Sequence, residues 1–370
     1  MNKKQPRKGV LTTAEIHKTY QYKTGVQVVK TRNRYAIPVA NPLVLPDCEL
    51  PVHPYVLGIW LGDGNSYSAQ ITCHKDDVEI ADYLRECGIN LVVRQNDQRN
   101  ANVLNLHLDP RVYDPNFCRR GHDKNQLGRT KKGHCAECNR QRSNAYQRGT
   151  PIDPIRKDQI SLAEKLRTLG VLHGPNRTEV GNRKHIPSLY LRASFLQRLA
   201  LLQGLMDSDG YIAKEGGRCE FVTTAPGISE KFGELLVSLG IKYTSAEKFP
   251  TTVYLGKKVY GKKAWRFSFL VYDDKPIFRL KRKLAKLVSR QGRRTTETER
   301  RRIVSVELVE SVPVRCIQVD SPNSLYLAGH NMVPTHNTEL ENNALGYYIH
   351  QDPAPIMLVM PTERDAETWS

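Results

Sequence analysis

A long apolar segment that ends in Asp-Gly occurs twice in this chain. The first copy is Tyr55–Gly64 and the second is Phe195–Gly210. Each copy is followed by residues suited to strands and then by a helix-forming segment that closes in Gly-Ile, at Gly88 and at Gly240. This internal repeat predicts two similar halves of one α+β domain, with both of those glycines as C-terminal helix caps.

Small residues form a stripe along each apolar segment. Gly58 and Gly62 are four residues apart in the first, and Gly204 and Ser208 are four apart in the second. Residues at that spacing share one face of a helix, so two such helices can approach closely. Large apolar residues flank the stripes and are expected to bury the pair: Leu57, Trp60, Leu61, Leu201, Leu205 and Met206.

Each apolar helix is predicted to stop at its Asp-Gly pair. Gly64 and Gly210 would supply a left-handed cap, which leaves Asp63 and Asp209 at the negative ends of the helix dipoles. A single copy favours a plain helix stop and turn. Two carboxylates at adjacent helix ends would instead raise the pKa of one or require a cation such as Mg²⁺, which indicates a metal site for phosphodiester hydrolysis.

Charge points to a nucleic-acid partner. Lys and Arg number 56 against 38 acidic residues, a net charge of +18. The sequence has no apolar stretch of transmembrane length and no signal-peptide core, which argues against a membrane protein. Its eight cysteines are too sparse for a disulfide scaffold in 370 residues, so we expect a reducing compartment.

Four of the cysteines and histidines are grouped between the two halves. Cys118, His122, Cys135 and Cys138 have the spacing of a tetrahedral Zn²⁺ site, with His134 as a competing fourth ligand and a chance grouping as the plainer alternative. Basic residues surround the group and favour a DNA-backbone clamp: Arg119, Arg120, Arg129, Lys131, Lys132, Arg140, Arg142 and Arg148. A second basic segment, from Arg279 to Lys286, either follows phosphates or is a solvated helix face.

The segments Val56–Gly64 and Leu202–Gly210 resemble the two LAGLIDADG motifs of a homing endonuclease, the first with Trp60 and Gly62 in place of commoner residues. The resemblance implies two αββαββ halves, a saddle-shaped sheet on double-stranded DNA, and Mg²⁺ at Asp63 and Asp209. It also implies that Lys184 activates water or stabilises charge at the scissile phosphates, the alternative being a solvated surface lysine.

The segment Val314–Gly329 followed by Met332–Thr338 resembles the closing splicing blocks of an intein, read as two strands joined by a turn at Ser321–Ser324. That resemblance implies that Asn337 cyclises, that His336 assists proton transfer, and that Thr338 holds the ester joining the flanking sequences. One intein subgroup uses an internal cysteine as nucleophile, and Cys316 with Thr335 resembles it; a buried structural cysteine is the alternative.

Residues after Asn337 read as a helix and a buried strand and resemble the ATPase domain of a phage terminase large subunit, with Thr338 in its phosphate-binding loop. The opening intein blocks are not recognised, so we expect a fragment or the C-terminal partner of a split intein, completed by an upstream intein and terminase fragment. The expected location is the cytoplasm of a phage-infected bacterium.

The sequence therefore predicts an α+β protein with a zinc module inserted in an endonuclease and flanked by pieces of an all-β splicing domain. The predicted segments are a partial splicing domain at 1–46, the endonuclease at 47–300 with the zinc module at 112–150, closing splicing blocks at 301–337, and host protein at 338–370. We expect Mg²⁺-dependent double-strand cleavage of the intein-free host gene. The alternative, which Trp60 and Gly62 allow, is a splicing element whose endonuclease insert is inactive or only binds DNA.

Overall fold

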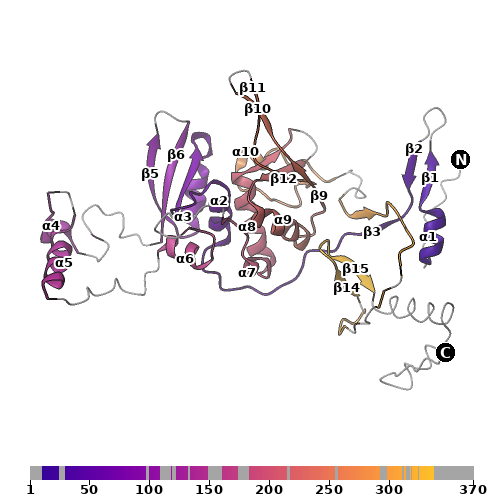
Figure 1. Ribbon diagram of the computed structural model, residues 1–370, viewed down its shortest axis with the longest axis horizontal. Coiled ribbons are helices and arrows are strands. Elements are labelled where there is room, and N and C mark those ends of the chain that lie inside the picture. Colours follow the sequence, from indigo (N-terminus) through magenta and orange to yellow (C-terminus); the bar gives the residue numbers. More distant parts are fainter. Residues whose placement is uncertain are drawn as a thin grey trace. The chain divides into compact units, whose positions relative to one another are not determined.

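Two compact units make up the chain, residues 41–300 and residues 1–40 with 301–370. They are seen in a computed structural model (Figure 1). It describes residues 11–24, 30–96, 100–108, 118, 122–131, 134–148, 161–173, 183–214, 217–254, 257–291, 298–310, 312–313, 317, 319–323 and 325–336. Within these ranges no helix is both long and apolar enough to cross a membrane.

The first half of the larger unit is a three-stranded antiparallel sheet with helices. Its elements in chain order are α2 (Pro54–Asp63), β4 (Gln70–His74), the 3₁₀ turn η1 (Lys75–Asp77), α3 (Glu79–Glu86), β5 (Asn90–Asn96), β6 (Ala101–His107) and α6 (Leu162–Thr168). The strand order is β4-β6-β5. Between β6 and α6 the chain forms α4 (Lys124–Leu127) and α5 (Ala136–Arg148).

The second half repeats this topology with additions. Its elements are α7 (Ser188–Leu191), α8 (Phe195–Ser208), β7 (Gly210–Ile212), β8 (Arg218–Thr223), α9 (Pro226–Ser238), β9 (Tyr243–Lys248), β10 (Thr251–Tyr254), β11 (Lys257–Tyr260), β12 (Ala264–Leu270) and α10 (Lys281–Leu284). The sheet order is β7-β8-β12-β9, and β10 and β11 form a separate hairpin. In the first half a single bridge from Gly64 to Ile71 takes the place of β7. The predicted repeat of α+β halves is therefore present.

Helices α2 and α8 lie side by side between the two sheets (Figure 1). A Cβ added to Gly58 would lie 2.4 Å from the Leu201 carbonyl oxygen, and one added to Gly204 would lie 2.4 Å from the Tyr55 carbonyl oxygen. The predicted stripe of small residues is thus the contact face. The large apolar residues flanking it are buried at 0–1% exposure, Leu57, Trp60, Leu61, Leu201, Leu205 and Met206.

The glycines that end the helices act in two ways. Gly88 and Gly240 have φ of +79° and +66° and follow α3 and α9, which confirms them as left-handed caps. The prediction of left-handed caps at Gly64 and Gly210 is wrong. Gly64 is extended, with φ −77°, and a Cβ there would lie 2.1 Å from the Trp60 carbonyl oxygen; a Cβ on Gly210 would lie 2.4 Å from that of Met206. Glycine is required at both positions because the backbone passes close to the last helical turn, and not because φ is positive.

The smaller unit begins with a capped helix. Thr12 and Glu15 form a capping box at the start of α1 (Thr13–Thr19). The unit also contains β1 (Gln21–Thr24), β2 (Lys30–Asn33), β3 (Ala36–Pro38), β13 (Arg300–Arg302), β14 (Leu325–Ala328) and β15 (Val333–His336). The strands pair as β1-β2, β13-β3 and β14-β15. Two contacts join the chain segments that precede and follow the larger unit in the sequence. They are the β13-β3 pair and a hydrogen bond of 2.7 Å between His17 Nδ1 and the Val306 carbonyl oxygen.

Candidate active site and metal centre

Two acidic residues lie at adjacent ends of the central helix pair. Asp63 is the last residue of α2, and Asp209 is the C-cap of α8. A Cβ on Gly62 would lie 3.3 Å from Asp209 Oδ2, so that carboxylate lies against the end of α2. Burial, and next the negative charge of Asp209, raise the pKa of Asp63 to about 6, and burial also raises the pKa of Asp209. Such a pair favours a bound cation.

Lys184 lies at the same place. Its side chain is buried, its Nζ donates to the Gly62 carbonyl oxygen at 3.0 Å, and the ammonium lies 5.3 Å from the centroid of the Trp60 ring. Burial lowers the pKa of Lys184 to about 8, although the charges of Asp209 and Asp63 oppose the shift. The alternative of a solvated surface lysine is therefore excluded.

A second buried lysine, Lys283, was not singled out from the sequence. Its Nζ donates to the carbonyl oxygens of Met206, Asp207 and Gly210 at 2.7, 2.8 and 2.7 Å, at the end of α8. Burial lowers the pKa of Lys283 to about 8, a shift that the charge of Asp207 opposes. The internal repeat indicates this lysine: Lys184 follows the first half, so an equivalent lysine is expected after the second half.

The two carboxylates fit a Mg²⁺ ion that shares its coordination with substrate. Among the described residues, the Cys/His group is the one set of three or more ligating side chains close enough to hold an ion. Asp63 and Asp209 therefore offer two protein carboxylates at most. Mg²⁺ is commonly held by one or two carboxylates, with phosphate and water oxygens completing the octahedron.

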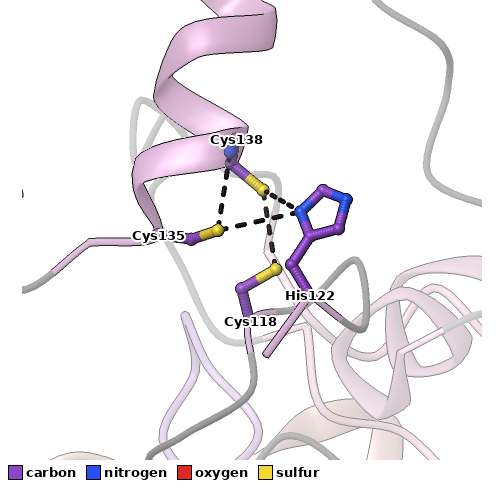
Figure 2. A group of neighbouring side chains, drawn as sticks. All are labelled: Cys118, His122, Cys135 and Cys138. Atoms are coloured by element: carbon purple, nitrogen blue, oxygen red, sulfur yellow. Dashed lines mark hydrogen bonds between the residues drawn. The ribbon is translucent and has the colours of Figure 1, made fainter. Parts of the chain in front are cut away.

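Cys118, His122, Cys135 and Cys138 do come together (Figure 2). Their ligand atoms lie within 4.8 Å of one another. Cys138 Sγ lies 3.5 Å from Cys118 Sγ and 3.3 Å from His122 Nδ1, and Cys135 Sγ lies 3.7 Å from the same nitrogen. His134 is exposed and outside the group, which decides between the two histidines.

Local structure brings the four ligands together. Cys135 comes directly before α5 and Cys138 lies in the first turn of that helix. The Cys118 amide donates to the His122 carbonyl oxygen at 3.0 Å, which holds the other two residues of the group side by side. Three sulfurs and one imidazole nitrogen form a common structural Zn²⁺ ligand set.

We predict that purified protein holds about one Zn²⁺ per chain and that His122→Ala lowers the zinc content several-fold, because a closed tetrahedral site needs all four ligands. The matched variant His134→Ala should keep the wild-type content. Atomic emission of protein purified without chelator measures both. Equal loss in the two variants, or no zinc in the wild type, would contradict the assignment.

Three of the predicted splicing residues lie outside the described residues: Cys316, Asn337 and Thr338. Thr335 and His336 end β15, where they pair with Tyr326 and Leu325 of β14. The predicted second strand before Gly329 is therefore present. Ile317, Val319 and Asp320, the described residues of the predicted first strand, are not in a strand.

A family profile described as a LAGLIDADG-like domain matches residues 196–271, which run from α8 to the end of β12. The second half of the larger unit therefore contains a LAGLIDADG-like domain. The first half repeats the topology of the matched half. Gly62, in the first of the two motif-like segments, faces the second, since a Cβ there would lie 2.1 Å from Ser208 Oγ. Trp60, in the same segment, is fully buried and its ring nitrogen donates to the Ser68 carbonyl oxygen at 3.1 Å. Both residues that depart from the motif pattern thus take part in the packing of the larger unit.

Relatives of the chain are replicative helicases. It is 32% identical over 331 residues to a replicative DNA helicase DnaB of Mycobacterium intracellulare, a match that covers 90% of this chain and 42% of that protein. It is 63% identical over 38 residues to a replicative DNA helicase DnaB of Mycobacterium leprae (strain TN), covering 10% of this chain and 6% of that one. The chain thus spans less than half the length of these relatives.

Two solved structures of a homing endonuclease are similar in part. One, of mesophilic variants of I-DmoI, has a TM-score of 0.27 and 10% identity, covering 60% of this chain and 89% of the other. Another, of I-DmoI with DNA and Ca, has a TM-score of 0.28 and 11% identity, covering 64% and 95%. Superpositions this weak establish no shared fold for the LAGLIDADG domain.

The prediction of a terminase host is wrong, because the relatives are helicases. It rested on the 33 residues after Asn337, read as the end of a phosphate-binding loop, a helix and a buried strand. That succession is common to P-loop ATPases, since the loop must deliver phosphate to the start of a helix. A segment so short does not separate one such ATPase from another.

Proposed function

We propose that the LAGLIDADG domain cleaves both strands of double-stranded DNA at a specific site, with Mg²⁺ as cofactor. The observation that carries this is the group at the ends of α2 and α8, where two carboxylates with raised pKa values lie beside two buried ammonium groups. Cleavage of a duplex carrying the helicase gene without the insert tests it.

Asp63 and Asp209 would hold the metal in this proposal. When bound, Mg²⁺ stabilises charge on the phosphate and activates water. The Lys184 ammonium lies at the same helix ends, where it neutralises negative charge that develops at the scissile phosphate. With its pKa lowered to about 8, Lys184 also exchanges a proton more readily near neutral pH than an ordinary lysine.

Both sheets have an open face suited to DNA. In β4 and β8 buried residues alternate with more exposed ones, so one face packs on helices and the other is open. Arg94 on β5 and Arg266 on β12 are exposed, and Arg266 lies opposite Val222 and Ala246, which carry no charge. Exposed arginines on such a face can bind phosphates or base edges.

The zinc module would add contacts to the DNA backbone. None of the residues of α5 is buried. Exposed basic side chains on and near this helix are Arg129, Lys131, Arg140, Arg142 and Arg148. Because the zinc holds the start of α5, loss of the metal should also weaken the salt-dependent part of DNA affinity.

We further propose that the domain lies within an intein that interrupts a replicative helicase. The similarity to a DnaB helicase extends over 90% of this chain and so includes the LAGLIDADG domain, which indicates that the relative carries a similar insertion. In this proposal Cys316 is the internal nucleophile, Asn337 and Thr338 form the downstream junction, and Thr335 and His336 directly precede that junction in the sequence, at the end of β15.

Asn337→Ala is expected to block release at the downstream junction in a precursor that contains all splicing segments. Alanine has no side-chain amide to cyclise, so a branched ester on Thr338 should accumulate, whereas Cys316→Ala should leave a linear precursor. Intact mass spectrometry with and without mild alkali separates the two species. Normal ligation in Cys316→Ala would place the nucleophile elsewhere.

A further inference from the structure

The segment Arg279–Lys283 belongs to the second half but is bound by residues of the first half. We propose that this segment, here called the clasp, positions Lys283 at the end of α8, and that the ion pair between Arg282 and Asp77 of η1 is what holds it in register. The inference deepens the proposed function, because it makes one half of the domain set the site geometry of the other.

The ion pair is bidentate and partly buried. Arg282 Nε donates to Asp77 Oδ1 at 2.5 Å, and its terminal nitrogen donates to Oδ2 at 2.7 Å. Asp77 is 6% exposed, so its carboxylate is largely shielded from water where it meets Arg282. A planar guanidinium on both carboxylate oxygens fixes direction as well as distance, which a single ammonium contact does not.

Arg279, at the other end of the clasp, is held between two aromatic rings. Its guanidinium carbon lies 4.8 Å from the ring centroid of Tyr55 and 4.2 Å from that of Tyr83, and a terminal nitrogen donates to Glu86. The Lys281 amide donates to Glu79 Oε2 at 3.0 Å. Each of these partners belongs to the first half.

Asp207 of α8 anchors the clasp from the opposite side. It is 1% exposed and accepts the amides of Arg279 and Leu280 at 3.1 and 3.2 Å, and the Tyr55 hydroxyl at 2.9 Å. The clasp backbone is thereby fixed between the halves. Lys283 extends from it to the carbonyl oxygens of Met206, Asp207, Ser208 and Gly210, on either side of Asp209 in the sequence.

Lys184 is held by different contacts. A Cβ on Gly227, near the start of α9, would lie 2.6 Å from His185 Cβ and 3.1 Å from the Lys184 carbonyl oxygen. The backbone at Lys184 and His185 therefore packs on the second half, through Gly227. The clasp, which carries Lys283, is instead held to the first half through the Arg282–Asp77 pair. Breaking that pair should displace Lys283 and leave Lys184 in place.

The first test uses the protein alone. Limited acylation with acetic anhydride, followed by mass spectrometry, measures the accessibility of each lysine. In Arg282→Lys, which keeps the charge but not the bidentate geometry, and in Asp77→Asn, Lys283 should be acylated several-fold faster than in the wild type while Lys184 is unchanged. The surface-pair variant Asp82→Asn, which loses an exposed contact to Arg85, is the matched control.

The second test uses a supercoiled plasmid that carries the target. Because Lys184 lies at the end of α2 and Lys283 at the end of α8, we expect the two lysines to serve different strands. Both variants should then make the first cut at nearly the wild-type rate and the second roughly tenfold or more slower, because small misplacements at a reacting centre cost that much. Nicked circles would then accumulate.

Acylation that rises equally at both lysines, or at neither, overturns the inference, as does equal slowing of both cuts. A wild type that cuts no plasmid would refute the proposed function while the acylation result still decides the clasp.

Discussion

Asp63→Asn and Asp209→Asn are each expected to lower the rate of DNA cleavage by at least about 10³-fold, since loss of a metal carboxylate removes several kcal/mol of transition-state stabilisation. Binding of the target duplex should change less than about twofold, because phosphate and base contacts come from other surfaces. Single-turnover cleavage and a gel-shift titration measure the two quantities.

Asp82→Asn is the matched control for the charge change, since Asp82 is an exposed carboxylate on α3 that pairs with Arg85. It should cleave at the wild-type rate. If Asp63→Asn and Asp209→Asn keep activity, these residues do not hold the metal. If they lose cleavage and binding together, the substitutions act on the fold.

Gly204→Ala is expected to destabilise the larger unit by about 3 kcal/mol, the upper range for overpacking, because the added Cβ would meet backbone atoms of α2. Those atoms are the Tyr55 carbonyl oxygen at 2.4 Å, the Ile59 nitrogen at 2.8 Å and the Gly58 Cα at 2.9 Å. The better helix propensity of alanine offsets less than about 1 kcal/mol of that cost. The midpoint of thermal unfolding should fall by roughly 6–12 °C.

Gly88→Ala separates crowding from backbone conformation. Gly88 has φ +79°, but a Cβ there meets nothing within 4 Å, so its cost should stay near about 1 kcal/mol. A fall in the unfolding midpoint no larger for Gly204→Ala than for Gly88→Ala would mean that the two helices do not cross at their glycines.

Features that depend on local pattern were predictable from the sequence. The apolar runs, the four-residue spacing of Gly58 and Gly62, and the closing Gly-Ile phrases fixed two helices, their contact face and two left-handed caps, all of which the structure contains. The group of Cys118, His122, Cys135 and Cys138 was predictable for the same reason, since its spacing is the one that a tetrahedral metal site requires.

Features that depend on the partner surface were not predictable. Lys283 lies in a basic run that reads like a solvated helix face, and its burial depends on the carbonyl groups at the end of α8, which the run does not reveal. Gly64 and Gly210 follow a helix like ordinary caps, yet what requires glycine is a carbonyl oxygen of the last turn. The terminase prediction failed because a phosphate-binding loop and its helix are shared by many ATPases.

Incubation of the protein with linear DNA that contains the helicase coding sequence without the insert tests the central claim most directly. With Mg²⁺ we expect one double-strand cut at the position where the insert would lie, with none in EDTA and none in DNA that already carries the insert. Intact DNA in Mg²⁺, or cutting that persists in EDTA, would contradict the assignment of Asp63 and Asp209 as the carboxylates of a metal-dependent endonuclease.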